Sequence, residues 1–275
     1  MIQINNLGFS YGNIPVLDNI TMKLEPGRIY GLLGENGVGK TTLLTLLCGL
    51  KKTLSGSIDV DGSDPYDREP DLLASQYYLP DEVAALPVKA EQFARMEGEF
   101  WPDYDHARFL EIMRLFENDP EKKMNAMSAG QLKKTYISFA LSLGCRYLYL
   151  DEPTNGLDPN QIVDIRNLIR DIAKHHAVLL STHILSEVQA ICDNIYMIES
   201  GKLVFSGTME EFDNYVAPES FIVEFANSPS KEVLENLTEN NGIEALEDGS
   251  YRIFLKDDIS ITEKYIQESV KQNWN

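Results

Sequence analysis

The fold of this chain is decided by the stretch GENGVGKTT at residues 34–42. The apolar run IYGLL at 29–33 predicts a buried strand before it, and the run LLTLL at 43–47 predicts a helix packed on that strand. A glycine loop between a strand and a helix is the setting that the pattern G-x-x-x-x-G-K-[ST] requires. We therefore expect a loop that binds the phosphates of a nucleotide.

The residue types of this loop suit an anion. Its glycines let the backbone curl so that successive N–H groups point inward, and the helix that follows presents its positive N-terminal end to the same phosphates. We expect the Lys40 ammonium to reach the β- and γ-phosphates and the Thr41 hydroxyl to bind Mg²⁺. The loop residues expected to contact the nucleotide are Gly34, Asn36, Gly37, Val38, Gly39, Lys40, Thr41 and Thr42.

The composition narrows the classes of partner. Among 275 residues, 43 are Asp or Glu and 24 are Lys or Arg, giving a formal net charge of −19. A nucleic-acid-binding surface is basic, and an anionic membrane repels an acidic protein, so we expect neither to be a direct partner. No apolar run approaches the ~20 residues needed to cross a bilayer, so any membrane role is expected to come through another protein. Cys48, Cys145 and Cys192 lack metal-like spacing and are expected to be buried, reduced thiols.

Alternating strand and helix patterns predict an α/β fold. Residues 1–30 alternate apolar and polar positions between turn signals, which predicts antiparallel strands. Short apolar runs at 147–150, 177–180 and 195–198 alternate with helical stretches, as in a parallel sheet covered on both faces. Helical spacing over 90–123 predicts a helical insert. The apolar positions of that insert are Phe93, Met96, Phe100, Phe109, Met113 and Phe116.

The pattern changes again at the C-terminal end of the chain. Residues 216–275 are interpreted as a small acidic α+β appendage, with strands at 221–225 and 251–255 and a capping box at 260–263 that opens a last helix. Three roles are open for this appendage: regulation, dimer contacts, or shielding of a hydrophobic edge.

Two carboxylates and a histidine follow two of the apolar strands. Asp151 ends the first strand, where it can hold the Mg²⁺ water shell, and Glu152 can polarise a water for attack on the γ-phosphate. His183 follows the strand at 177–180, so the same sheet edge is expected to bring its imidazole near the γ-phosphate.

A second anion-binding end is predicted at MSAGQ, residues 127–131, which opens a helix rich in apolar residues. One chain is unlikely to need two such helix ends for a single phosphate group. The two ends together therefore favour a nucleotide that is shared between two subunits.

These residues resemble one family closely, the ATPase subunits of ATP-binding cassette (ABC) transporters, over about residues 1–212. The loop at 34–42 resembles the family's Walker A loop, and MSAGQ resembles its signature LSGGQ. Asp151 and Glu152 match its Walker B pair. GLDP at 156–159 resembles its D-loop, and His183 its switch histidine.

The resemblance implies a P-loop NTPase cassette over 1–215, with a mixed sheet core, an antiparallel β subdomain and a helical subdomain at about 81–130, followed by the appendage at 216–275. It implies two chains, identical or different, packed head to tail around two ATP molecules. Each ATP would meet Lys40, Thr41, Asp151, Glu152 and His183 of one chain and Ser128 and Gly130 of the other. Tyr11 would stack on adenine, and Asp158 would join the nucleotide site.

The same resemblance implies the cellular setting. A separately encoded integral membrane permease would carry the cargo, no nucleic acid would take part, and the chain would lie at the cytoplasmic face of the cell membrane. The GLDP loop and the single cassette look like exporter-type systems.

Two positions depart from the family pattern. The third signature position is usually Gly and is Ala129 here. The family usually has Gln after a strand such as 76–79, where it touches Mg²⁺ and couples to the membrane subunit, and that position is Asp81 here. We therefore expect Asp81 to join Thr41 and Asp151 around the metal, with altered metal affinity or coupling.

Two other functions stay open. One is a soluble cassette ATPase that acts on nucleic acid or ribosomes, which the single cassette and the acidic charge oppose. The other is an interaction module that binds ATP without hydrolysing it, which Glu152 and His183 oppose.

Overall fold

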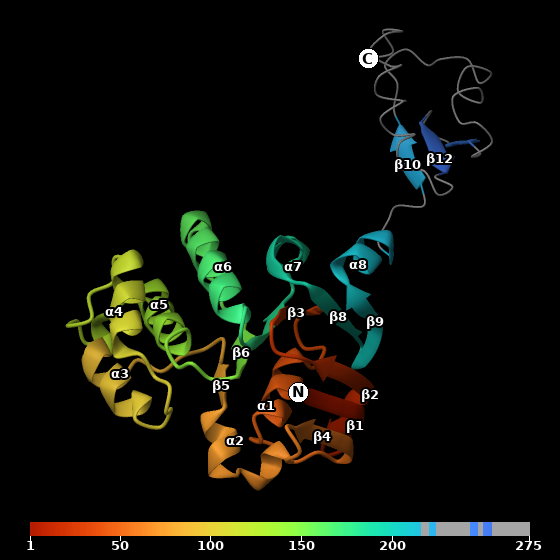
Figure 1. The fold of residues 1–275 in the computed structure, drawn as a ribbon. Coiled ribbons are helices and arrows are strands. Elements are labelled where there is room, and N and C mark those ends of the chain that lie inside the picture. The colour runs from red at the N-terminus through yellow and green to blue at the C-terminus, as the bar shows by residue number, and fades with distance from the viewer. Residues whose placement is uncertain (216–219, 224–242, 247–249, 255–275) are drawn as a thin grey trace, which may run out of the picture. The chain divides into compact units, whose positions relative to one another are not determined.

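The computed structural model describes residues 1–215, 220–223, 243–246 and 250–254, shown in colour in Figure 1. Two compact units make up the chain, Met1–Phe212 and Asp213–Asn275. Among the described residues, every helix is too short or too polar to traverse a lipid bilayer.

A six-stranded mixed sheet forms the centre of the first unit. Five strands run parallel, and the edge strand β9 pairs antiparallel with β8. In spatial order the strands are β5 (Gln76–Leu79), β6 (Tyr147–Asp151), β7 (Ala177–Thr182), β3 (Arg28–Leu33), β8 (Asn194–Glu199) and β9 (Lys202–Thr208). The carboxyl ends of the parallel strands meet at one edge, where ligands of such sheets bind.

A second, antiparallel sheet packs with the helix α1 (Lys40–Leu47) on one face of the central sheet. Its strands, in the order β2-β1-β4, are β1 (Ile2–Tyr11), β2 (Ile14–Leu24) and β4 (Ser55–Val60). Side chains of a strand alternate between faces, so Tyr30 and Leu32 of β3 enter this core while Ile29 and Leu33 enter the core on the other face. The predicted mixed α/β fold with an antiparallel β subdomain is confirmed.

Helices cover the other face of the central sheet. Here α6 (Pro159–Ala173) and α7 (Leu185–Ile191) bury an apolar stripe each. α8 (Met209–Tyr215) contributes the buried ring of Phe212. Between β4 and β5, the short helices η1 (Pro65–Asp67) and α2 (Pro70–Ala74) are elements that the sequence analysis did not predict.

The helical insert consists of α3 (Ala90–Gly98), α4 (His106–Leu115), η2 (Met124–Ala126) and α5 (Ala129–Ala140). Figure 1 shows α3, α4 and α5 grouped beyond β5. Four of its six apolar positions are buried, whereas Met96 is 63% exposed and Phe100 is 71% exposed. The helix α3 ends at Gly98, so Phe100 lies beyond it, and the Tyr104 ring leaves room only for glycine there, since an added Cβ would lie 2.2 Å from the ring.

The described part of the second unit is a small antiparallel sheet in the order β10-β12-β11. Its strands are β10 (Ser220–Val223), β11 (Ile243–Ala245) and β12 (Tyr251–Phe254). β10 and β12 overlap the two strands expected in the appendage, and β11 was not predicted. The capping box expected at 260–263 lies outside the described residues.

All three cysteines are buried and free, in agreement with the sequence analysis. Burial raises the pKa of the Cys145 thiol and of the Cys192 thiol to about 12. The pKa of Cys48 is raised by burial as well.

Candidate functional site

The loop between β3 and α1 takes a backbone form that depends on its glycines. Gly37 and Gly39 have φ values of 84° and 112°, in the left-handed region. A Cβ on Gly34 would lie 2.5 Å from the carbonyl oxygen of Ile198, because the loop passes close to β8. The loop then leads directly into the N-terminus of α1 at Lys40.

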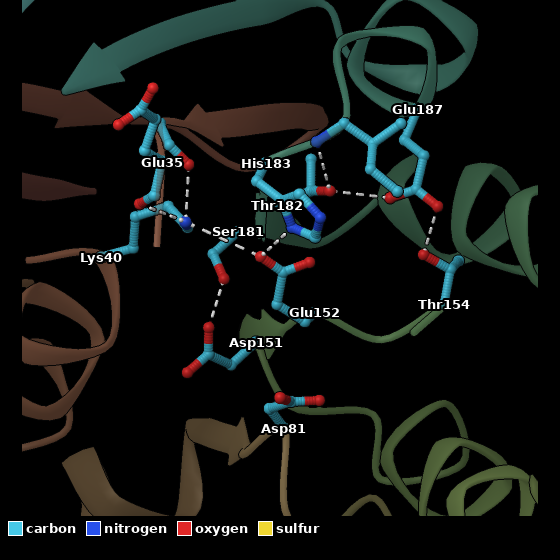
Figure 2. A network of polar contacts seen from close by, with 12 residues as sticks. Glu35, Lys40, Asp81, Asp151, Glu152, Thr154, Ser181, Thr182, His183 and Glu187 are labelled. Carbon is cyan, nitrogen blue, oxygen red and sulfur yellow. Dashed lines mark hydrogen bonds and ion pairs between the residues drawn. The ribbon is translucent and has the colours of Figure 1, made fainter. Parts of the chain in front are cut away.

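Lys40 folds back across this loop (Figure 2). Its side chain is 6% exposed, and Nζ donates hydrogen bonds to the carbonyl oxygens of Gly34 at 2.7 Å and Glu35 at 3.0 Å. The same ammonium lies 3.7 Å from Oε1 of Glu152. A buried cation held mainly by neutral carbonyls at a helix N-terminus suits an incoming phosphate.

Asp151 is fixed by hydroxyl groups from three neighbouring elements. It is 2% exposed, and Oδ2 accepts hydrogen bonds from the Thr41 hydroxyl at 2.7 Å and the Tyr78 hydroxyl at 3.1 Å. Oδ1 accepts a hydrogen bond from the Ser181 hydroxyl. Burial and the Asp151 charge raise the pKa of Tyr78, which keeps its hydroxyl a donor. The carboxylate is therefore held in one orientation at the end of β6.

Glu152 and His183 form a pair at the ends of β6 and β7 (Figure 2). Glu152 Oε1 lies 3.0 Å from His183 Nδ1, and the Glu152 backbone N–H donates to the Ser181 carbonyl oxygen at 3.1 Å. Glu152 has a φ of 45°, a left-handed conformation that is uncommon outside glycine. Uncommon backbone conformations of this kind occur often at functional sites, and the Glu152 carboxylate lies close to Lys40 here.

Most of the predicted phosphate-site residues line one cavity of about 270 Å³. Tyr11 stands at this cavity with 47% of its surface exposed, and its hydroxyl lies 3.4 Å from Thr42 Oγ1. The hydrogen bond from Thr42 lowers the pKa of Tyr11. The lining residues are Tyr11, Val16, Asn36, Gly37, Gly39, Lys40, Thr41, Thr42, Asp81, Asp151 and Glu152.

Other predicted residues lie outside this cavity. Gly34 and Val38 line a neighbouring cavity of about 710 Å³ behind the loop. Ser128 is exposed and caps α5 in a capping box: its Oγ accepts from the Gln131 N–H at 3.2 Å, and Gln131 Oε1 accepts from the Ser128 N–H at 3.1 Å. Gly130 and the exposed Asp158 are likewise absent from the cavity lining. The α5 terminus is thus well formed but does not face this chain's own phosphate loop.

Lys133, which the sequence analysis missed, forms hydrogen bonds with the loop that follows β5. Lys133 of α5 is 5% exposed, and its Nζ donates to the Asp81 carbonyl oxygen at 2.7 Å and the Pro80 carbonyl oxygen at 3.3 Å. The Asp81 carboxylate lies 3.4 Å from the same nitrogen. Burial lowers the pKa of Lys133, while Asp81, Asp151 and Glu152 act to raise it.

Glu187 of α7 is the second residue that the sequence analysis missed (Figure 2). It is 5% exposed, and its carboxylate accepts hydrogen bonds from the Thr154 hydroxyl and, at 2.8 Å, from the Thr182 hydroxyl. Thr182 Oγ1 also accepts from the Ile184 N–H at 3.1 Å. Glu187 thereby joins the segment after Glu152 to the segment that carries His183.

The donor set at the cavity fits a magnesium ion. Thr41, Asp151 and Asp81 bring hydroxyl and carboxylate oxygens to the same cavity. Mg²⁺ prefers such oxygen ligands and takes only one or two carboxylates beside water and substrate phosphates.

The fold and the site define a P-loop nucleotide-binding protein. Residues 17–155 match the model of the family described as ABC transporter. The chain belongs to this family, and it is an ATP-binding, ATP-hydrolysing subunit of an ABC transport system.

Named relatives and solved structures agree with this family. The chain is 33% identical to the bacitracin transport ATP-binding protein BcrA of Bacillus licheniformis, over 74% of this chain and 68% of the relative. It is 31% identical to the tungstate uptake system ATP-binding protein TupC of Peptoclostridium acidaminophilum, over 74% of this chain and 96% of the relative.

Two solved structures share the fold. One is an ATP-binding subunit of an ABC transporter, with a TM-score of 0.72 and 24% identity over 78% of this chain and 92% of that chain. The other is a dimeric post-hydrolysis state of an ATP-binding cassette bound to ADP and Pi, with a TM-score of 0.67 and 20% identity over 76% of this chain and 99% of that chain.

Proposed function

We propose that this chain pairs with a second cassette ATPase, identical or different, around two ATP molecules and drives a separately encoded membrane permease in the direction of export. The observation that carries the proposal is the convergence of Lys40, Asp151 and Glu152 on one cavity at the carboxyl edge of the sheet. ATP is the substrate of the reaction, and the permease would hold the chain at the cytoplasmic face of the membrane.

The chain's own residues provide the chemistry of hydrolysis. Lys40 and the loop N–H groups would neutralise the β- and γ-phosphates, and α1 would add its positive end. Glu152 would accept a proton from the attacking water or orient it. His183 Nδ1 lies 3.0 Å from Glu152 Oε1 and would hold that carboxylate by donating its N–H, and Nε2 of the doubly protonated ring would donate toward the γ-phosphate. Tyr11 would place the adenine by stacking.

Mg²⁺ would be held by Thr41, Asp151 and Asp81, and it would supply positive charge against the phosphate oxygens. Since the Thr41 hydroxyl and Asp151 Oδ2 already lie 2.7 Å apart, these two ligands need little rearrangement. Few side chains would have to be ordered when Mg²⁺ binds, so little conformational entropy would be lost.

The position of the α5 terminus supports a shared nucleotide. Ser128 and Gly130 form an anion-binding helix end, yet neither lines the cavity of its own chain. A second chain packed head to tail would bring a γ-phosphate to this end, and Asp158, on the adjacent exposed loop, would lie near the same contact. Hydrolysis then removes the phosphate bridge and lets the two chains separate, because closure needs a ligand that binds the closed state better.

A groove at the helical insert supports the permease as a partner. It has a volume of about 520 Å³ and is lined mostly by apolar side chains from the core and the insert, with Arg68 as its cation. Phe100 is 71% exposed and Leu50 is 55% exposed on this groove. Exposed apolar side chains around a concave surface are typical of a docking site.

The experiment that tests the permease is co-purification from membranes. Phe100→Asp should abolish recovery of a membrane protein with the chain and leave ATP turnover of the purified chain within about twofold of wild type, because the groove lies outside the phosphate cavity. Met96→Asp is the matched control, since Met96 is 63% exposed on α3 but does not line the groove. Equal recovery with both variants would reject this docking site.

Export is tested with inverted membrane vesicles that carry the chain and its co-purified membrane protein. Cargo candidates added on the cassette side should stimulate ATP turnover and accumulate in the vesicle lumen. Stimulation only from the lumenal side would instead indicate import.

Two alternatives are separated by simple measurements. A cassette that acts on nucleic acid or ribosomes should show turnover stimulated by RNA or DNA, which the net charge of −19 disfavours. An ATP-dependent interaction module should bind ATP but release no phosphate, which the Glu152–His183 pair disfavours.

A further inference from the structure

The charges around the phosphate cavity are unbalanced when only its lining is considered. Among the described residues that line it, Asp81, Asp151 and Glu152 are carboxylates and Lys40 is the single cation. A triphosphate adds further negative charge to the same space. A nearby cation that offsets one carboxylate would therefore favour nucleotide binding.

Lys133 does not line the cavity itself, but it is close enough to the lining to supply that cation. It reaches from α5 to the loop after β5, with its ammonium bonded to two backbone carbonyls and 3.4 Å from the Asp81 carboxylate. Its side chain is 6% exposed, whereas that of Asp81 is 43% exposed and faces the cavity. We call the side of the cavity that carries Thr41, Asp151 and Asp81 the metal edge. The Asp81 carboxylate thus has the buried Lys133 on one side and the cavity on the other.

We propose that Lys133 is a positioning residue that neutralises Asp81 and ties the metal edge of the cavity to helix α5. The carboxylate at position 81 and the lysine at position 133 act as one unit. The pair makes an aspartate acceptable beside the triphosphate, because Lys133 offsets its negative charge and holds its loop.

The pair also lies close to the capped N-terminal end of α5. Ser128 caps the helix, and Lys133 follows five residues later, about 7.5 Å along the axis. On the proposed function, on which this step rests, Ser128 contacts the partner's ATP while Lys133 holds the metal edge of this chain's own ATP. A helix with both contacts moves the two sites together.

The first test uses the full chain without nucleotide, so it does not depend on turnover. Thermal unfolding is measured for Lys133→Gln, Asp81→Gln and the double variant. We expect the double variant to lose less in melting temperature than the sum of the two single losses, by about 2 °C or more, because each single change leaves the other charge unpaired. If the two single losses in melting temperature simply add in the double variant, the residues are not coupled and the proposal is overturned.

The second test measures phosphate release against Mg²⁺ concentration at saturating ATP. Lys133→Gln frees the Asp81 carboxylate and should lower the Mg²⁺ concentration for half-maximal rate about threefold. Asp81→Gln should raise it, and the double variant should return to within about twofold of wild type. Shifts in the same direction, or no return in the double variant, would overturn the proposal, since a structural role alone predicts no opposite shifts.

The neighbouring lysine provides the control. Lys134 is also buried on α5, but its Nζ donates to the Phe116 carbonyl oxygen at 2.9 Å, away from Asp81. Asp81→Gln should therefore not restore Lys134→Gln in either test. If Lys133→Gln does not fold by itself, Asp81→Gln must restore folding, and failure to do so counts against the pair.

The proposed function and the coupling of Asp81 with Lys133 are tested by different outcomes. A wild-type chain that releases no phosphate would reject the proposed function, while the unfolding cycle would still decide whether Asp81 and Lys133 are coupled.

Discussion

Glu152→Gln separates ATP binding from hydrolysis in this chain. Glu152 is 8% exposed, with Oε1 3.0 Å from His183 Nδ1 and 3.7 Å from Lys40 Nζ. Glutamine has the same shape, so it keeps the packing and an oxygen for His183. It loses the negative charge and the capacity to accept a proton from water.

The expected magnitudes follow from these contacts. Loss of a general base lowers turnover about 100-fold or more. A unit charge 3.7 Å from Lys40 is worth about 1 kcal/mol in a water-like dielectric and more for this buried pair, so releasing Lys40 should tighten ATP binding by at least about fivefold. Slow hydrolysis with intact binding should trap the closed pair of chains.

The assays are phosphate release, equilibrium binding of a fluorescent ATP analogue, and light scattering with MgATP. A variant that stays monomeric with saturating ATP would refute the reasoning, as would turnover within threefold of wild type. Glu35→Gln is the control: it removes the same charge from the same loop, but the Glu35 side chain is exposed and points away from Lys40 (Figure 2). It should leave turnover nearly unchanged.

Three further changes test other parts of the site. Ser128→Arg should abolish turnover yet leave ATP affinity within about twofold, because Ser128 lies outside its own chain's cavity; an equal loss of affinity, measured by titration, would contradict the shared site. Tyr11→Ala should weaken ATP binding by about 1–3 kcal/mol through lost stacking, and Tyr11→Phe should not; equal affinities of both variants would exclude stacking. Glu187→Ala should cost about 2–4 kcal/mol of unfolding free energy in urea, since it leaves buried hydroxyls unpaired; a loss below 1 kcal/mol would show that water replaces the carboxylate.

The site residues that could be predicted are those that belong to short local sequence patterns. The glycine loop, the carboxylates after β6 and the histidine after β7 each follow an apolar strand directly. Parallel strands bring their carboxyl ends to one edge, so the local patterns were sufficient to place Lys40, Asp151, Glu152 and His183 together.

The parts that were not predictable depend on contacts between distant segments. Lys133 meets Asp81 from 52 residues away, and Glu187 meets Thr154 from 33 residues away. A lysine or glutamate at helical spacing normally predicts a solvated helix face, and only the packing of α5 and α7 against the sheet buries these two. The exposure of Phe100 was not predictable either, because this residue lies beyond the end of α3 at Gly98.

The buried cysteines make this chain convenient for spectroscopy. All three native thiols are buried, and burial raises the pKa of each, so they should react with maleimides far more slowly than an ordinary surface thiol. A single cysteine introduced at Val163, which is 52% exposed on α6, would therefore carry a fluorophore or spin label without removal of the native ones. Such a label could then be followed through the catalytic cycle with the native cysteines in place.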